Sequence, residues 1–242
     1  MKKITFLFFF SVLLVFADAG AFPLRVKIVG GWGWISGGDL NRNLRGWKDF
    51  FNDRNEAPYA FSFDVEELHR TQEAALEFVY ELSSHIHAGL TVEYLSGKTE
   101  GRASSSLTYE KDYFNSAQDF GLISLEEQRE QLPRYHFRSI PILLTLYYSR
   151  PFLRKGDFFF GLGAGFYTGR LDYRERYHYE FDYRDEKTLS GSPLLFVEEY
   201  STTGEYSEKT LANTLGLHGK AGIELSLYKG LCFVLEITGR WV

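Results

Sequence analysis

The chain has 242 residues, of which 44% are hydrophobic and 17% aromatic, with 23 glycines but only 6 prolines. This composition favours one β-rich domain over a soluble helical enzyme, which would carry more Ala and Leu in amphipathic helices. The net charge of −5 at pH 7 suits neither nucleic acid nor an anionic membrane surface as a partner. The single cysteine, Cys232, excludes an internal disulfide and a cysteine-based zinc site.

The first 19 residues have the pattern of a secretory signal peptide. Lys2 and Lys3 form a short positive region, residues 4–16 are apolar, and Ala17-Asp18-Ala19 supplies the small-x-small pattern of a cleavage site. The apolar run is shorter than the roughly 20 residues that a membrane-spanning helix needs, although an uncleaved anchor is the alternative. The sequence therefore predicts a signal peptide over 1–19 and one exported domain over 20–242.

Seven later segments alternate between apolar and polar residues with the period of two that is typical of β-strands. They lie within 24–34, 76–82, 86–94, 139–148, 158–169, 215–227 and 233–241. No later stretch reaches the 18 consecutive apolar residues of a helical membrane span. The mean hydropathy of −0.24 is compatible with a membrane β-barrel, because only every second residue of its strands meets lipid.

The two faces of these segments differ in chemistry. One face carries charged residues at mid-strand, and we expect these to pair inside a narrow lumen, with the glycines of 158–169 leaving room for them. The predicted lumen residues are Lys27, Glu77, Glu81, His87, Glu93, His218, Lys220, Glu224, Glu236 and Arg240. The predicted lipid-facing residues are Trp32, Trp34, Tyr94, Tyr148, Phe158, Phe160, Phe166 and Trp241. Apolar residues outside, polar residues inside and aromatic girdles are typical of a barrel in lipid.

The links between the segments alternate in length. Those at 83–85, 150–157 and 228–230 are short, whereas those after the first, third and fifth segments run for tens of residues. Periplasmic turns and extracellular loops of a membrane barrel alternate in this way. A soluble sandwich has no reason to place every long loop at one end.

Seven is an unexpected number of strands for such a fold. Single-chain bacterial barrels have an even number of strands from 8 upward, because an open edge would leave backbone groups unsatisfied in lipid. We therefore expect an all-β, antiparallel up-and-down transmembrane β-barrel on an eight-stranded plan, with about seven strands present and the last one missing after Val242. A strand overlooked within a loop, for example at 194–200, is the alternative.

Two runs carry a resemblance to a known superfamily. Phe158–Tyr167 (FFFGLGAGFY) and Tyr80–Leu90 (YELSSHIHAGL) resemble strands of the small bacterial outer-membrane β-barrels, which include the OmpA-type transmembrane domain and OmpW-like proteins. The resemblance covers most of residues 20–242, and its motifs specify architecture rather than activity. It implies location in a bacterial outer membrane, with its lipids as partners. The C-terminal strand with a terminal aromatic residue, the assembly signal of that superfamily, is missing.

The long links also contain patterns. Leu40, Leu44, Trp47, Phe50 and Phe51 are spaced for one helical face, which predicts a short helix over the barrel mouth, with lipid or ligand contact as the alternative. Tyrosines alternate with charges over 173–183, so we expect the fifth and sixth strands to continue as a hairpin beyond the membrane. Such a tyrosine-rich surface can recognise a partner.

The sequence predicts no catalytic residue, metal site or cofactor. His87 and His218 lie among carboxylates, where pairing with lumen charges is favoured over a metal or proton-transfer role. HExxH, Gly-x-Ser-x-Gly and phosphate-binding glycine loops are absent. A hydrolase site at the rim would have to combine residues 104–106 with Glu110 and His136.

These patterns favour a non-enzymatic outer-membrane protein with a side-chain-filled lumen and loops for surface contact. The alternatives are an OmpW-like narrow conduit for small or hydrophobic solutes, and a surface lipid-modifying or proteolytic barrel enzyme. A soluble lipocalin-like barrel is the competing fold, and it would point Phe158, Leu162 and Phe166 inward.

Overall fold

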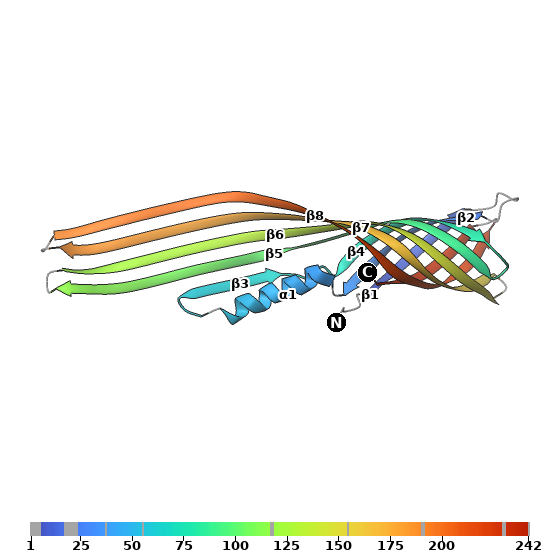
Figure 1. The fold of residues 1–242 in the computed structure, drawn as a ribbon, viewed down its shortest axis with the longest axis horizontal. Helices are drawn as coiled ribbons and strands as arrows, with labels where there is room; N and C mark the ends of the chain where they lie inside the picture. The colour runs from blue at the N-terminus through green and yellow to red at the C-terminus, as the bar shows by residue number, and fades with distance from the viewer. Residues whose placement is uncertain are drawn as a thin grey trace.

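The computed structural model describes residues 6–16, 24–36, 38–54, 56–116, 119–153, 155–189, 192–228 and 231–241. The elements in these ranges are β1 (Phe6–Phe16), β2 (Leu24–Ser36), α1 (Gly38–Asp53), β3 (Tyr59–Val65), β4 (Arg70–Glu81), β5 (Ile86–Ser116), β6 (Asp119–Leu153), β7 (Gly156–Leu189), β8 (Ser192–Tyr228) and β9 (Leu231–Trp241). The molecule is elongated, with strongly curled strands at one end and a long flat sheet at the other (Figure 1). Within the described ranges, no helix is both long and apolar enough to cross a membrane.

All strand pairs are antiparallel. The sheet has the order β3-β5-β4-β2-β1-β9-β8-β7-β6, and β5 also pairs with β6. Apart from β3, which adds only to β5, the strands form an eight-stranded meander in which sequence neighbours are hydrogen-bonded neighbours. The expected all-β antiparallel architecture is confirmed at this level.

The expected number of about seven strands is wrong, because the meander of the described chain has eight. Phe6–Phe16, which the sequence analysis assigned to a signal peptide, pairs with β2 on one side and β9 on the other. It lies beside β9, where a strand was expected to be missing, and residues 194–200 belong to β8 rather than to an additional strand. A continuous apolar run has no alternation, so periodicity could not identify it as a strand. Cleavage after Ala19 stays a prediction, and it would remove β1.

Side chains alternate between a buried and an exposed face. In β4, Glu73, Glu77 and Val79 are buried, whereas Leu76 and Phe78 between them are exposed. The exposed apolar residues of the curled part are here called the apolar belt. They include Ile28, Trp32, Trp34, Leu76, Phe78, Tyr80, Leu90, Val92, Tyr94, Ile140, Ile142, Leu144, Leu146, Tyr148, Phe158, Phe160, Leu162, Phe166, Leu215, Leu217 and Ile237.

The apolar belt contains seven of the eight residues that were predicted to face lipid. The eighth, Trp241, is half-buried. Phe158, Leu162 and Phe166 are 45%, 74% and 43% exposed. The lipocalin-like alternative required these three side chains to point inward, so the structure argues against it.

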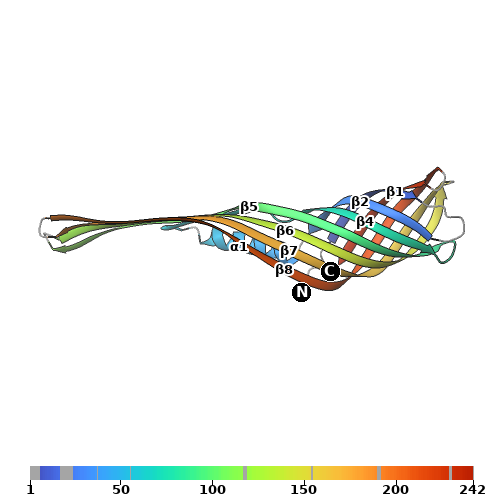
Figure 2. The same cartoon turned by 90° about the horizontal axis from the view of Figure 1, so that it is seen from above.

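Beyond the curled part, β5 to β8 continue as a four-stranded sheet, here called the extension (residues 96–116, 119–139, 169–189 and 192–212). The hairpin expected from the tyrosine-rich pattern is confirmed, since β7 and β8 stay paired out to Leu189 and Ser192. The expectation that residues 95–139 form a loop is wrong, because this segment forms a second hairpin. Figure 2 shows the extension as a thin single layer. Cross-strand aromatic contacts, such as Tyr135 to Tyr173 at 5.0 Å between ring centroids, support it.

The predicted helix is present as α1 and lies along the base of the extension beside β3, rather than across the end of the curled sheet (Figure 1). The Asn41 amide donates to the Leu68 carbonyl oxygen at 3.0 Å and accepts from the Leu68 N–H at 2.8 Å. The Phe51 ring stacks on Phe63 with centroids 5.6 Å apart. These contacts attach α1 to β3 and to the segment before β4.

A cysteine introduced at position 15 tests whether Phe6–Phe16 occupies the place beside β9. Val15 is the Cα partner of Cys232, and antiparallel partners lie about 4.5–5.5 Å apart, within the range that a disulfide bridges. We expect Val15→Cys to form an oxidised cross-link to Cys232, measured by mass spectrometry of non-reduced peptides.

Leu14→Cys is the matched control, because position 14 is one place out of register with Cys232. Two free thiols in molecules that retain residues 1–19 would contradict the assignment of β1. Loss of those residues from the purified protein would instead confirm the signal peptide and take β1 out of the sheet.

Candidate functional site

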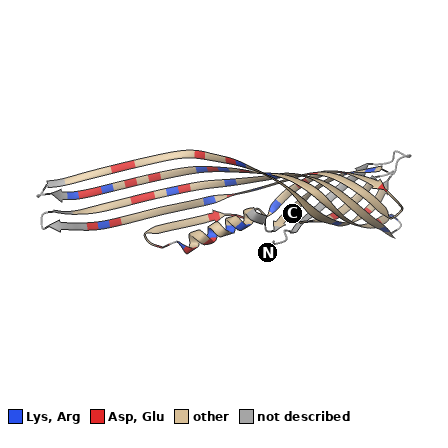
Figure 3. Cartoon of the chain, in the orientation of Figure 1, with Lys and Arg blue, Asp and Glu red and all other residues tan. Residues whose placement is uncertain are grey.

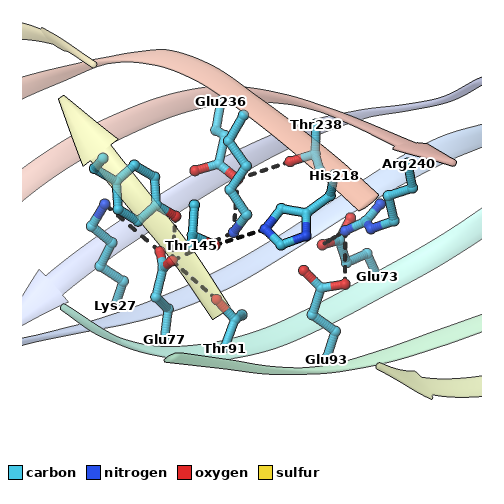
Figure 4. A network of polar contacts seen from close by, with 12 residues as sticks. Lys27, Glu73, Glu77, Thr91, Glu93, Thr145, His218, Glu236, Thr238 and Arg240 are labelled. Atoms are coloured by element: carbon cyan, nitrogen blue, oxygen red, sulfur yellow. Dashed lines mark hydrogen bonds and ion pairs between the residues drawn. The ribbon is translucent and has the colours of Figure 1, made fainter. Parts of the chain in front are cut away.

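Charged side chains gather on the buried face of the curled sheet. The set, here called the charge network, consists of Lys27, Glu73, Glu77, Glu93, Lys220, Glu236 and Arg240. All are at most 7% exposed, and they come from β2, β4, β5, β8 and β9. Figure 4 labels six of them, which point toward one another from different strands: Lys27, Glu73, Glu77, Glu93, Glu236 and Arg240. Burial of ionised groups in such numbers is tolerated only where they pair and are hydrogen-bonded.

One part of the network is centred on Arg240 of β9, which is fully buried. Its Nη2 atom donates to Glu73 Oε1 at 2.9 Å and to Glu93 Oε2 at 2.8 Å (Figure 4). A single guanidinium group thus joins β9 to β4 and β5. The planar guanidinium suits this role because it stays charged and presents several donors in fixed directions.

The other part is centred on Glu77 of β4. Its carboxylate lies 3.7 Å from Lys27 Nζ and 3.5 Å from Lys220 Nζ. It also accepts hydrogen bonds from the hydroxyl groups of Thr91 and Tyr147. Lys220 Nζ reaches Glu236 Oε1 at 3.3 Å, so Lys220 links two carboxylates. Thr238 donates to Glu236 at 2.9 Å.

Neutral polar groups and glycines complete the packing. The His218 Nε2 and Thr145 Oγ1 atoms are 2.7 Å apart and hydrogen-bonded. A Cβ atom at Gly163 would lie 2.6 Å from the His218 ring, and one at Gly161 would lie 2.6 Å from the Tyr147 ring. The glycines of β7 therefore leave room for interior side chains, as the sequence predicted, with Tyr147 and His218 as the residues that fill the space.

A smaller ion-pair group lies where β2, β4 and β8 approach their short links. Arg25 Nη1 is 3.1 Å from Glu224 Oε1, and Arg25 Nη2 is 3.7 Å from Glu81 Oε2. The His87 Nε2 and Ser149 Oγ atoms are 2.8 Å apart nearby. The Glu81 side chain is 42% exposed because it ends β4.

The buried face leaves little empty space near this group. A hollow lined by Arg25, Lys27, His87, Tyr147, Phe159 and neighbouring residues measures about 20 Å³. That is room for about one water molecule. Among the described residues, no group of three or more His, Cys, Asp or Glu side chains is arranged to hold a metal ion.

Nine of the ten residues predicted for the lumen lie on the buried face, and Glu81 lies at its edge. Glu73 was missed. Alternation placed Arg25, Tyr147 and the threonines at 91, 145 and 238 on the polar face, but they were not among the predicted lumen residues. Glu73 continues the alternation of Glu77 toward the N-terminus and was missed because the predicted strand began at 76, six residues after Arg70. Alternation placed Tyr147 on the polar face, but no local pattern indicated that its hydroxyl group would donate a hydrogen bond to Glu77.

The set proposed for a rim hydrolase is not brought together. His136 is opposite Lys98 and hydrogen-bonded to Ser96, 3.1 Å away. Ser104 lies six residues beyond Lys98 on β5, which is roughly 20 Å at about 3.3 Å per residue. Glu110 lies farther out again, opposite Ser124. These residues therefore form no catalytic cluster.

No protein-family model matches the sequence, and no curated protein matches it. The likeness of 80–90 and 158–167 to small outer-membrane barrels therefore stays a resemblance in strand pattern. What the structure supports is a mostly antiparallel β protein with many exposed large apolar side chains.

Removal of the Arg240 charge tests the energetics of the network. Arg240→Met leaves Glu73 and Glu93 buried without their counter-charge, and breaking a buried pair in this way costs about 3–5 kcal/mol. We expect a markedly lower urea midpoint for unfolding in detergent. Adding Glu73→Gln and Glu93→Gln to Arg240→Met should restore part of the loss.

Arg184→Met is the matched control, because among the described residues Arg184 forms an ion pair only with the nearby Asp182 on the extension. We expect this change to alter stability by less than about 0.5 kcal/mol. An equal, small effect of both substitutions would contradict the structural role of the charge network.

Proposed function

We propose that the eight-stranded meander closes into a transmembrane β-barrel of the bacterial outer membrane, with β1 retained as its eighth strand; cleavage after Ala19 would leave seven strands. The pairing of β1 with β9 and of β5 with β6 supports closure, since each strand of the meander then has two hydrogen-bonded neighbours. Closure satisfies the backbone groups that an open edge would leave unpaired in lipid.

The observation that carries the proposal is the inversion of the two faces. Leu144 and Leu162, which a water-soluble protein would bury, are 65% and 74% exposed. Glu77 and Arg240, which it would place in water, are 0% exposed. Monomeric soluble proteins rarely expose apolar patches larger than a few hundred Å². Lipid around the apolar belt removes this conflict.

We further propose that the barrel has a side-chain-filled lumen and serves as a structural or surface-interaction protein. An eight-stranded barrel is just wide enough for its interior side chains. The charge network joins opposite strands, which supports a blocked interior over free diffusion of solutes. The extension, with its tyrosines and charges, is then the part available for contact at the cell surface.

An OmpW-like conduit remains the second proposed function, and an enzyme of the surface lipid-modifying or proteolytic kind the third. The conduit requires a route for solutes past the charge network or sideways between strands. The enzyme requires a cluster other than residues 104–106, Glu110 and His136.

Charge placed on the apolar belt tests the membrane location. In lipid, Leu144→Arg should destabilise the protein by about 2–4 kcal/mol, because an arginine near the bilayer midplane is costly. Leu195→Arg is the matched control, since Leu195 is 64% exposed but lies on the extension. We expect unfolding in lipid vesicles to be shifted by the first change only.

The same preparations show whether the protein enters membranes at all. We expect it in the detergent-extracted membrane fraction, with faster gel migration before boiling than after. The proposal would be contradicted if Leu144→Arg and Leu195→Arg changed stability equally, or if the protein were recovered in the aqueous fraction.

Planar-bilayer recording separates the first two functions. A lumen filled by ion-paired side chains predicts no stable conductance steps for the wild-type protein. Reproducible ohmic steps in the wild type would favour the conduit instead.

A further inference from the structure

The exposed face of the extension changes character directly beyond the apolar belt. Past Tyr94, Ile140 and Phe166, the same face of β5 to β8 becomes predominantly basic, as the alternation and register of the strands place it. These residues are here called the basal patch. Its basic members are Lys98, Arg102, Arg134, Arg138, Arg170, Arg174, Arg176 and Lys209, and its acidic members are Glu100, Asp172 and Glu205.

Farther out, this face has the opposite sign. Its acidic residues are Glu110, Asp112, Glu126, Glu130, Glu180, Asp182, Glu186 and Glu199, and Arg184 is its basic residue. Figure 3 shows blue segments close to where the strands leave the curled part, and red segments interspersed with some blue ones farther along. In a chain of net charge −5, this separation gives the basal patch a local sign opposite to that of the whole protein.

The acidic members neutralise only part of the basal patch. Asp172 lies 2.6 Å from Arg170 Nε and 3.0 Å from Arg138 Nη2. Burial pushes the pKa of Asp172 upward, but the Arg170 hydrogen bond and the charges of Arg170, Arg138 and Lys209 hold it below its usual value. Within the described residues, Lys98, Arg174 and Lys209 form no ion pair with a carboxylate.

The patch is also hollowed. Lys98, Arg134, Arg138 and Arg174, together with His136, Glu100 and Asp172, line an open hollow of about 500 Å³. Burial and the charges of Arg138 and Lys98 lower the pKa of His136 below its usual value, which favours the neutral ring. The positive charge therefore comes from Arg and Lys side chains, which do not titrate near neutral pH.

We propose that the basal patch binds the phosphate groups of anionic lipid headgroups in the membrane around the protein. The inference rests on the proposed membrane function, because the patch continues the face that would meet lipid. Arginine side chains match phosphate with paired hydrogen bonds, and basic residues close to an anionic surface are attracted to it. The acidic outer part of the same face is repelled by that surface, which favours an extension that stands away from the membrane.

The test uses the full chain in nonionic detergent micelles that contain a fluorescent phosphatidic acid, with the fluorescent phosphatidylcholine as comparison. We expect phosphatidic acid to bind the wild type more tightly than phosphatidylcholine. The combined variant Lys98→Gln, Arg134→Gln, Arg174→Gln and Lys209→Gln should bind phosphatidic acid roughly tenfold or more weakly, since each basic residue contributes to the attraction.

The control variant removes charges from the outer part of the same face by Glu126→Gln, Glu180→Gln, Asp182→Asn and Glu199→Gln. It should bind phosphatidic acid as tightly as the wild type or more tightly. Equal binding of phosphatidic acid by the wild type and the basal variant would overturn the inference. So would displacement of the lipid by millimolar inorganic phosphate, because the site would then recognise free phosphate.

Failure of this inference is distinguishable from failure of the proposed function. Heat-modifiable gel mobility is measured on the same samples and is expected to be retained by both variants. If the protein keeps this mobility but shows no lipid preference, only the proposed lipid binding by the basal patch is contradicted. If the wild-type protein lacks heat-modifiable mobility and needs no detergent, the proposed membrane function itself is contradicted.

Discussion

The enclosed face of the curled sheet must neutralise its own charges, and the rest of the structure depends on this constraint. Glu73 and Glu93 share Arg240, while Glu77 and Glu236 share Lys220. A strand that slipped by one residue would move its charges to the exposed face and its leucines inward. The ion pairs therefore select one register for β4, β5, β8 and β9. The gain is in specificity more than in stability, because desolvation offsets much of the attraction between buried charges.

The sequence predicted the strands whose residues alternate with a period of two. It predicted much less of the segments without that alternation. Alternation around Leu144 and Phe160 separated the exposed from the buried face of their strands, and Glu77 and Arg240 were assigned to the face that the structure buries. Phe6–Phe16 lacks alternation and matches a signal peptide equally well. The hairpin over 95–139 carries polar residues on both faces, so only its cross-strand pairing reveals it. Pairing of Arg240 with Glu93, 147 positions apart, depends on topology that no local pattern contains.

The two parts of the molecule differ in which side chains they expose. In the curled part, apolar residues are exposed and charges buried, which suits lipid outside and a packed interior. In the extension, both faces carry polar and aromatic residues, and the exposed face separates its charges along its length. The change from Phe166 to Arg170 on one face of β7 marks the boundary between these two parts. A headgroup layer at that level would contact the basic residues, with the acidic part beyond it.

Collision accessibility of nitroxide labels along β6 tests the central claim most directly. Labels are attached one at a time at positions 140–148 in protein reconstituted into vesicles, with Cys232 replaced by serine. The account predicts high accessibility to oxygen and low accessibility to a nickel chelate at the even positions, and low accessibility to both at the odd positions. High nickel accessibility at Ile142, Leu144 and Leu146 would show that these side chains meet water and would contradict it.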